Sequence, residues 1–248
     1  MNATFREHTH PIIRKLESIF RLSDDEKAAV MDLPLQITAI KADQDIVREG
    51  DRPSRCFAVL DGFACTFKIT GEGKRQISSF HIPGDLPDLQ SLHLTVLDIS
   101  IGTITPCSIG FVQHEAARDL CARFPRIGSA FWRETLIQAA IFREWVTNVG
   151  RREAYGRVAH LLCEMAVRMR AVGLADANTC DLPMTQNELA DATGMSTVHV
   201  NRTLQELRAD GLITLKGASL TVLDWNGLKH AGDFDPTYLH FERKDVAA

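Results

Sequence analysis

The chain has 248 residues, of which 45% are hydrophobic and 24% charged, and its formal net charge is −4. Such a chain can bury a full hydrophobic core, and its length predicts two domains rather than one. The N-terminus lacks the charged, apolar and small-residue series of a signal peptide, and no run approaches the ~18 apolar residues of a membrane span. We therefore expect a cytoplasmic protein with no membrane partner. Its six cysteines include no CxxC pair, so neither a zinc site nor a disulfide framework is indicated, and no metal site is predicted.

Short runs rich in Ile, Val, Phe and Thr occupy residues 36 to 115 and are broken by regularly spaced turn residues. Gly50, Gly62, Gly73 and Gly84 recur at intervals of 12, 11 and 11 residues, each in turn-prone company such as "EGD" or "PGD". Strands that alternate with turns at this spacing are typical of antiparallel sheets. The pattern predicts an N-terminal antiparallel roll or barrel.

A helix of several turns is predicted from Pro125 to Val149, because the stretch has no internal proline and many helix formers. Its apolar residues wrap around more than one face, which suits a helix that packs on its own roll on one side and on a partner subunit on the other. A helix fully buried within one domain is the alternative. The predicted dimer-interface residues are Phe131, Gln138, Phe142 and Trp145. Two glycines bracket the charged residues of "NVGRREAYG", 148–156, which is the predicted hinge.

Two helices joined by a glycine are predicted from Thr185 to Ile213. Thr185 and Glu188 are spaced as a capping box at the start of the first helix. Gly194 stands where the chain must pass through a left-handed conformation. Ser196 can cap the second helix.

The second helix has one apolar and one polar side. At about 100° per residue, Val200, Leu204 and Leu207 share a buried stripe, and Arg202 lies opposite it. This is the helix-turn-helix arrangement whose second helix enters the DNA major groove. A plain helical hairpin with a solvated back is the alternative. The predicted base-reading residues are Thr197, Val198, His199, Asn201 and Arg202.

The side-chain chemistry of this helix suits base recognition. Arg202 can pair with guanine, Asn201 with adenine, and the Val198 methyl groups with a thymine methyl. The alternating residues of "TLKGASLTVLD" predict a β-hairpin wing with its turn at 216–219. The predicted phosphate contacts, which set register, are Thr185, Gln186, Ser196 and Lys216.

The net charge of the C-terminal part argues weakly against DNA binding. Residues 151–248 contain 11 Lys and Arg against 13 Asp and Glu, a net charge of −2, whereas DNA-binding domains often carry a basic excess. The basic footprint must therefore be local, gathered from Arg151, Arg152, Arg157, Arg202, Arg208 and Lys216. We expect modest non-specific affinity with a strong dependence on salt.

The segment "MTQNELADATGMSTVHVNRTLQELRADGLI" resembles the Crp/Fnr family of bacterial transcription regulators. The resemblance implies an α+β fold: an N-terminal antiparallel β-roll of the cyclic-nucleotide-binding type with an N-terminal helix (1–124), a long central dimerisation helix (125–149), and a C-terminal winged helix-turn-helix domain (150–223). A tail (224–248) follows, and its role is left open. The resemblance also implies a homodimer, a palindromic operator on double-stranded DNA, and RNA polymerase as a partner.

Individual positions follow the family only in part. In the family, the residue at the position of Arg202 reads a guanine. The residues at the positions of Thr197 and Val198 make neighbouring base contacts. The best-known members carry Arg and Glu where this chain has Thr197 and Val198. Their operator is therefore not assumed for this protein.

The residues of the roll bear on the effector, which the sequence leaves unknown. No Lys or Arg occurs from Gln76 to Ala117, and Pro87 and Asp88 stand where the family forms its phosphate cradle, so a cyclic nucleotide is not expected. No cysteine precedes Cys56, which argues against the N-terminal iron–sulfur cluster of Fnr. Haem or metal sensing remains open, because a neutral histidine can bind a haem iron or a metal ion. The candidate ligands are His8, His10, His81 and His93. An apolar effector, or none, also remains open.

The leading interpretation is a DNA-binding transcription regulator. The alternative is a small-molecule- or haem-sensing module whose helix-turn-helix serves a protein contact. An enzyme is not expected, since no nucleophile elbow, phosphate-binding loop, dinucleotide fingerprint or zinc-protease spacing occurs. No catalytic residue is predicted.

Overall fold

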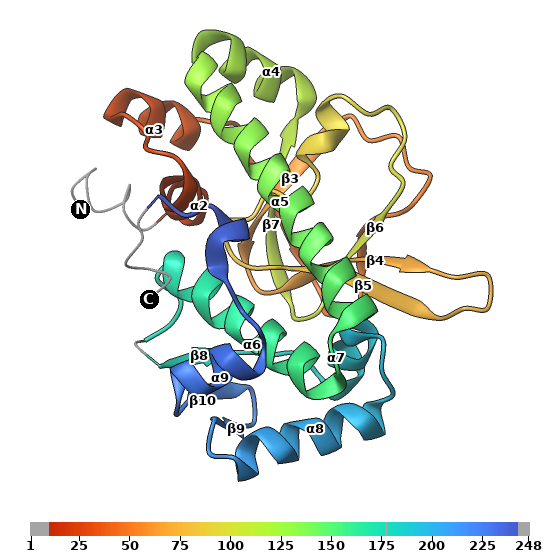
Figure 1. The fold of residues 1–248 in the computed structure, drawn as a ribbon. Coiled ribbons are helices and arrows are strands. Elements are labelled where there is room, and N and C mark those ends of the chain that lie inside the picture. The colour runs from red at the N-terminus through yellow and green to blue at the C-terminus, as the bar shows by residue number, and fades with distance from the viewer. Residues whose placement is uncertain (1–9, 177, 243–248) are drawn as a thin grey trace.

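The structure is a computed structural model that describes residues 10–176 and 178–242. The β-roll, the long helix α5 and the C-terminal helical domain are packed side by side, and α8 lies at the edge remote from most of the roll (Figure 1). Two helices precede the roll, α2 (Pro11–Ile19) and α3 (Asp24–Met31). No helix among the described residues is long and apolar enough to cross a membrane.

The roll consists of two antiparallel sheets. Its strands are β1 (Gln36–Ile40), β2 (Asp45–Val47), β3 (Arg55–Asp61), β4 (Ala64–Ile69), β5 (Arg75–His81), β6 (Ser100–Thr103) and β7 (Cys107–Gln113). One sheet has the order β1-β7-β3 and the other β2-β6-β4-β5. Phe57, Ile101 and Ile109 fill the space between the sheets and are fully buried. The predicted antiparallel roll is confirmed.

The four turn glycines explain how the strands reverse. Gly50, Gly62, Gly73 and Gly84 all have positive φ, between 80° and 102°, a region that residues with a Cβ avoid. At Gly84 the backbone also lies against the carbonyl of Pro11 in α2, where a Cβ would collide. The turn that follows strand β5 therefore depends on glycine for both conformation and space.

The helix α5 (Pro125–Arg151) runs across the roll and ends two residues beyond the predicted helix. It follows α4 (His114–Arg123), and a 3-10 turn, η1 (Leu89–Leu92), lies beside it. Arg152 and Glu153 are extended, and α6 (Ala154–Ala171) begins directly after them. This bend falls inside the predicted hinge.

The C-terminal part combines helices with a small sheet. After α6 come β8 (Thr179–Asp181), α7 (Gln186–Thr193), α8 (Thr197–Ala209), β9 (Ile213–Lys216), β10 (Ser219–Val222), α9 (Trp225–Ala231) and η2 (Pro236–Leu239). The sheet has the order β8-β10-β9, and the predicted wing is its β9–β10 hairpin, in which Ser219 pairs with Lys216. Strand β8 was not predicted, because its three residues are too few to show a strand pattern.

A buried ionic network joins the roll, α2, α5 and α6. The Asp85 carboxylate, after β5, lies 2.8 Å from Lys15 Nζ and 2.9 Å from Arg168 Nη2. Lys15 Nζ is also 3.3 Å from Glu134, and Arg168 Nη1 is 3.1 Å from Glu164. All five side chains are at most 6% exposed. Burial alone would lower the pKa of Lys15, but the neighbouring carboxylates raise it above its usual value, so it stays charged.

Candidate nucleic-acid interface

The turn between α7 and α8 has the geometry that its sequence predicts. The Thr185 hydroxyl accepts from the backbone N–H of Glu188 at 3.3 Å, and the Glu188 carboxylate accepts from the backbone N–H of Thr185 at 2.5 Å. Gly194 has φ 66°, in the left-handed region. The Ser196 hydroxyl accepts from His199 N at 3.3 Å and so caps α8. Local hydrogen bonds thus fix the start of α8.

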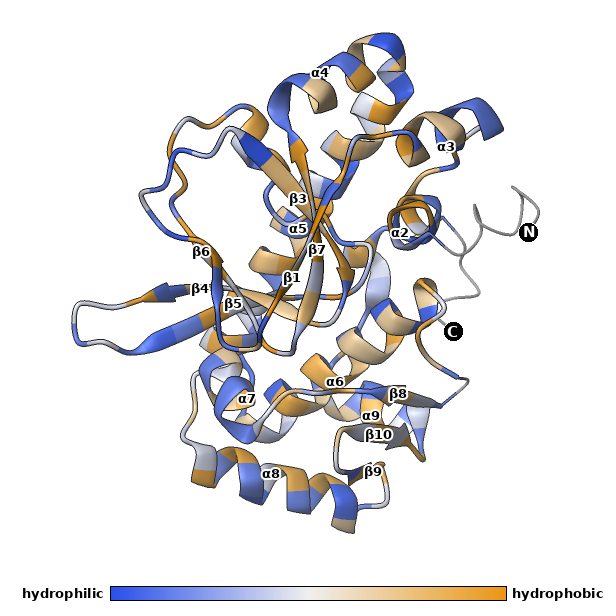
Figure 2. Ribbon diagram, turned by 180° about the vertical axis from the view of Figure 1, so that it is seen from behind, coloured by the Kyte–Doolittle hydropathy of each residue, from blue (hydrophilic) through white to orange (hydrophobic). Residues whose placement is uncertain are grey.

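One side of α8 is buried and the other is exposed. Val200, Leu204 and Leu207 are at most 1% exposed and belong to the core of the C-terminal part. Hydrophobic and hydrophilic residues alternate in bands along this helix (Figure 2). Val198 is 80% exposed, and the Arg202 side chain is 67% exposed. Single exposed apolar side chains are common on protein surfaces, so Val198 counts toward a binding face only together with the polar residues beside it.

Most of the predicted base-reading residues line one depression. It is lined by Gln186, Thr197, Val198, Asn201, Arg202 and Gln205. Asn201 Nδ2 donates to Gln186 Oε1 at 3.0 Å. Arg202 Nε lies 3.7 Å from Glu206, an exposed and weak pair that leaves the guanidinium able to turn outward. The structure brings these side chains together at the N-terminal end of α8.

The remaining predicted contacts lie outside the lining of this depression. His199 is half-buried on the flank of α8, Thr185 and Ser196 are exposed at the two helix starts, and Lys216 is exposed on the wing. The hydroxyls of Thr185 and Ser196 serve as caps. Exposed N-termini of helices are favourable places for phosphate oxygens.

Two of the arginines expected in the basic footprint have structural contacts. Arg157 Nη1 donates to the Thr193 carbonyl at 3.0 Å, and Arg152 Nη2 lies 2.7 Å from Glu144. Arg202, Arg208 and Lys216 are exposed. Arg151, at the end of α5, is exposed as well, so the exposed positive charge of the expected footprint comes from α8, the wing and the end of α5.

Three of the four predicted dimer-interface residues are buried within the chain. Phe131, Gln138 and Trp145 are at most 7% exposed. Trp145 packs edge-on against Phe80, with ring centroids 5.7 Å apart, and its indole N–H donates to Glu164 at 3.0 Å. Phe142 is half-buried. Apolar residues surround α5, so the sequence could not tell which of them face the chain's own roll and α6.

The exposed apolar side chains of α5 are different ones. Trp132, Leu136 and Val146 are 69%, 54% and 74% exposed. At about 100° per residue they fall within about 80° of one another around the helix. This set is named the α5 face below.

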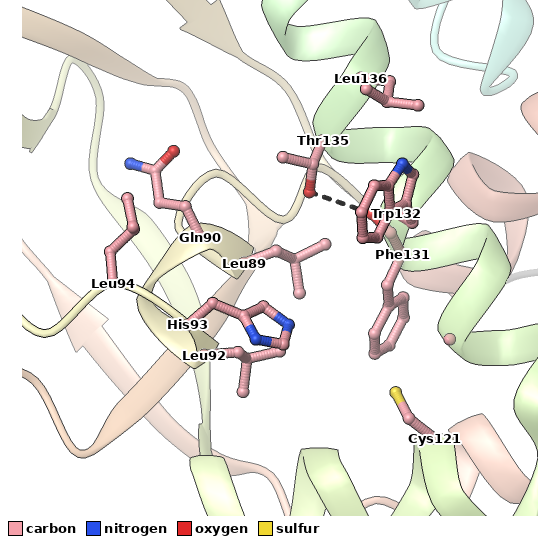
Figure 3. A pocket seen from close by; sticks show the side chains of 11 residues that line it. Leu89, Gln90, Leu92, His93, Leu94, Cys121, Phe131, Trp132, Thr135 and Leu136 are labelled. Carbon is pink, nitrogen blue, oxygen red and sulfur yellow. Dashed lines mark hydrogen bonds between the residues drawn. The ribbon is translucent and has the colours of Figure 1, made fainter.

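A cavity of about 340 Å³ lies beside the α5 face, between η1 and α5 (Figure 3). Its lining includes Leu89 and Leu92 from η1, Cys121 from α4, and Phe131 and Trp132 from α5. None of the described residues that line it is a lysine or an arginine. The cavity therefore offers an apolar ligand a good environment and an anion no lysine or arginine.

Asp88, directly before η1, is a buried acid. It is fully buried, and it accepts from Phe57 N at 2.9 Å. Burial raises the pKa of this carboxyl to about 8. A buried carboxyl thus occupies the stretch where the family resemblance implies a phosphate cradle.

The described histidines considered for haem or metal, His10, His81 and His93, lie at different elements. His81 is 1% exposed, its Nε2 lies 2.7 Å from the Thr66 hydroxyl, and burial lowers its pKa to about 3. His93 lines the η1–α5 cavity. His10 precedes α2, and His8 lies outside the described residues. The part of the chain that the structure describes contains no group of three His, Cys, Asp or Glu placed to hold a metal ion.

Fold and site together define a class of protein: a β-roll joined by a long helix to a winged helix-turn-helix. Comparison with family models gives the same division. A cyclic nucleotide-binding domain matches residues 37–124 and a Crp-like helix-turn-helix domain matches residues 156–231.

Known relatives and solved structures agree. The chain is 31% identical over 186 residues to the nitrogen fixation regulation protein FixK of Bradyrhizobium diazoefficiens, covering 73% of this chain and 75% of the relative. It is 27% identical to the transcriptional activator protein FnrL of Cereibacter sphaeroides, covering 85% and 86%. The structure of FixK2 from Bradyrhizobium japonicum superposes with a TM-score of 0.73 at 24% identity, covering 80% of this chain and 98% of that one. The chain belongs to the Crp/Fnr family of DNA-binding transcription regulators, which are not enzymes.

Proposed function

We propose that the protein binds a palindromic operator as a homodimer, with α8 of each subunit in the major groove. The exposed depression at the N-terminal end of α8 supports this most directly, because its lining gathers four of the predicted base-reading residues. A two-fold dimer matches two half-sites about one helical turn apart.

Within each half-site we assign Arg202 to a guanine, Asn201 to an adenine, and Val198 to a thymine methyl. Thr197 and His199 make neighbouring contacts. Asn201 must exchange its hydrogen bond with Gln186 for one to the base, which frees Gln186 for a phosphate. The other phosphate contacts are Thr185, Ser196 and Lys216.

The dimer forms, in this proposal, through the α5 face. Trp132 and Val146 are two heptads apart, with Ala139 midway between them, a spacing that suits a two-stranded helical contact. Burying these side chains against a second copy removes exposed apolar area from water, at about 25 cal/mol per Å². Half-buried Phe142 borders this face.

The η1–α5 cavity is the proposed effector site. Its lining suits an uncharged, largely apolar molecule rather than a cyclic nucleotide, and His93 at the same cavity is the residue that a haem iron would use. Because Trp132 belongs both to this cavity and to the α5 face, occupation of the cavity can favour one dimer arrangement over another. Because it acts on DNA, we also propose that the protein is located in the cytoplasm and that RNA polymerase is a partner.

Replacement of Arg202 by Ala tests the assignment. We expect it to cost about 1–3 kcal/mol on the specific operator and much less on random DNA. Fluorescence anisotropy with both duplexes measures this. Arg123→Ala is the control, since Arg123 is an exposed arginine of α4 whose side chain contacts Asp119 and the Phe124 ring. Equal losses on both duplexes would instead favour a helix-turn-helix that contacts a protein.

A further inference from the structure

The last described residues, 232–242, form a segment that leaves the DNA-binding part and crosses to the other side of the molecule. It follows α9 and passes α6 and α5 before it reaches α2 (Figure 1). The matched helix-turn-helix domain ends at residue 231, so this segment lies beyond it. We call residues 232–242 the strap.

The strap is seated closely on α6. A Cβ added at Gly232 would lie 2.6 Å from the backbone nitrogen of His160, so the strap backbone touches the helix backbone. His160 Nδ1 donates to the Gly232 carbonyl at 3.0 Å. Phe234 is 3% exposed and packs edge-on against the His160 ring, with centroids 5.2 Å apart. This end of the strap is fixed to the DNA-binding part.

The middle of the strap reaches the buried ionic network. The Tyr238 hydroxyl donates to Glu164 Oε2 at 2.7 Å, and Trp145 of α5 donates to the same oxygen at 3.0 Å. Burial and the nearby carboxylate raise the pKa of Tyr238 well above its usual value, so the phenol keeps its proton. One carboxylate oxygen of α6 therefore holds both the strap and the central helix.

The far end of the strap is attached to α5 and α2. Arg133 Nη2 donates to the His240 carbonyl at 3.1 Å and lies 3.4 Å from the Glu242 carboxylate. The backbone N–H of Glu242 donates to the Ser18 carbonyl at 2.9 Å. The strap thus connects the DNA-binding part to the helices that accompany the roll.

A second attachment, through α7, joins the DNA-binding part to the roll. Arg75 Nε of β5 lies 2.7 Å from Asp191 of α7, and Gln76 Nε2 donates to the Ala192 carbonyl at 3.3 Å. In the chain itself the two parts are joined only by the extended residues Arg152 and Glu153. The buried network adds a third attachment, since Arg168 of α6 lies 2.9 Å from Asp85 of the roll. Attachments at several places together oppose rotation about that bend.

We propose that the strap sets the angle between α5 and the DNA-binding part, and thereby the half-site spacing that the dimer reads. The inference rests on the proposed homodimer and its palindromic operator. Tyr238 and Arg133 act as positioning residues, since neither lies on the surface that faces DNA. With the strap released, each recognition helix still reads its half-site, but the distance between the two helices is held less tightly.

The test uses the full-length chain with Tyr238→Phe and Arg133→Gln combined. Its controls are Tyr155→Phe, which removes a tyrosine–carboxylate contact to Asp210 inside the DNA-binding part, and Arg123→Gln. Affinity is measured on a single half-site and on palindromes at the selected spacing and at one base pair more or less. One base pair rotates a half-site by about 36°, so we expect the wild type to prefer the selected spacing by roughly tenfold or more.

We expect the double variant to bind the single half-site as the wild type does, and its spacing preference to fall below about threefold, with both controls unchanged. An undiminished spacing preference would overturn the proposal, and so would an equal loss of affinity on every duplex. If the double variant does not fold, the same measurements are made on Arg133→Gln alone. The Arg133 side chain is 39% exposed, so we expect its replacement to leave the fold intact. A wild type that selects no half-site would instead refute the proposed function.

Discussion

Replacement of Asp85 by Asn removes the central charge of the buried network and should destabilise the protein strongly. The Asp85 carboxylate is 0% exposed and contacts Lys15 and Arg168 at 2.8 and 2.9 Å. Removing one partner of such a buried pair costs about 3–5 kcal/mol. We expect the lower end, about 3 kcal/mol, because Lys15 keeps Glu134 and Arg168 keeps Glu164. For a chain of this size that corresponds to a melting temperature lower by about 6–12 °C.

The pH dependence of this difference gives a second check. Burial alone would raise the pKa of Asp85, but Lys15 and Arg168 lower it below its usual value. A carboxyl with a depressed folded-state pKa stabilises the fold above its unfolded pKa of about 3.9 and loses that contribution as the pH falls through the folded value. The difference in the free energy of unfolding between wild type and Asp85→Asn should therefore be at its full value at pH 7 and become smaller below about pH 4.

Thermal unfolding followed by circular dichroism measures both effects, with Asp98→Asn as the control because Asp98 is exposed. A shift for Asp85→Asn as small as that of Asp98→Asn would refute the stabilising role of the network.

Three further predictions concern pH, assembly and the effector. Burial lowers the pKa of His81 to about 3, so the folded state excludes a proton that the unfolded chain binds below about pH 6.5. In urea unfolding, the free energy of unfolding that is lost between pH 7 and pH 5 should be about 2 kcal/mol smaller in His81→Gln than in the wild type. Trp132→Glu, which puts a charge on the α5 face, should shift the protein toward monomers in sedimentation velocity, whereas Ala122→Glu on exposed α4 should not. A cyclic nucleotide at millimolar concentration should leave the melting temperature unchanged, since the η1–α5 cavity has no lysine or arginine among its described lining residues; a clear rise would contradict the assignment of that cavity.

The helix-turn-helix could be predicted almost completely, because the forces that shape it are local. The capping box of Thr185, the left-handed Gly194 and the cap at Ser196 act within a few residues. The buried and exposed sides of α8 follow from helical periodicity. The turn glycines of the roll were predicted for the same reason, since each reversal needs a positive φ where it occurs.

The sequence could not predict contacts between residues far apart in the chain. Nothing near Asp85 indicates that Lys15 and Arg168 will meet it, since they lie 70 and 83 residues away. The orientation of α5 depends on which of its apolar sides the roll and α6 cover. Trp145 is on the covered side and is buried, whereas Trp132 is exposed. The strap likewise depends on where α2 and α5 lie.

Selection of bound sequences from a random DNA pool at low ionic strength tests the central claim most directly. We expect enrichment of a palindrome whose half-sites are centred about 10 base pairs apart, with a guanine that loses its enrichment in Arg202→Ala. A pool with no enriched sequence, or with a single asymmetric site that Arg202→Ala selects equally well, would contradict the account.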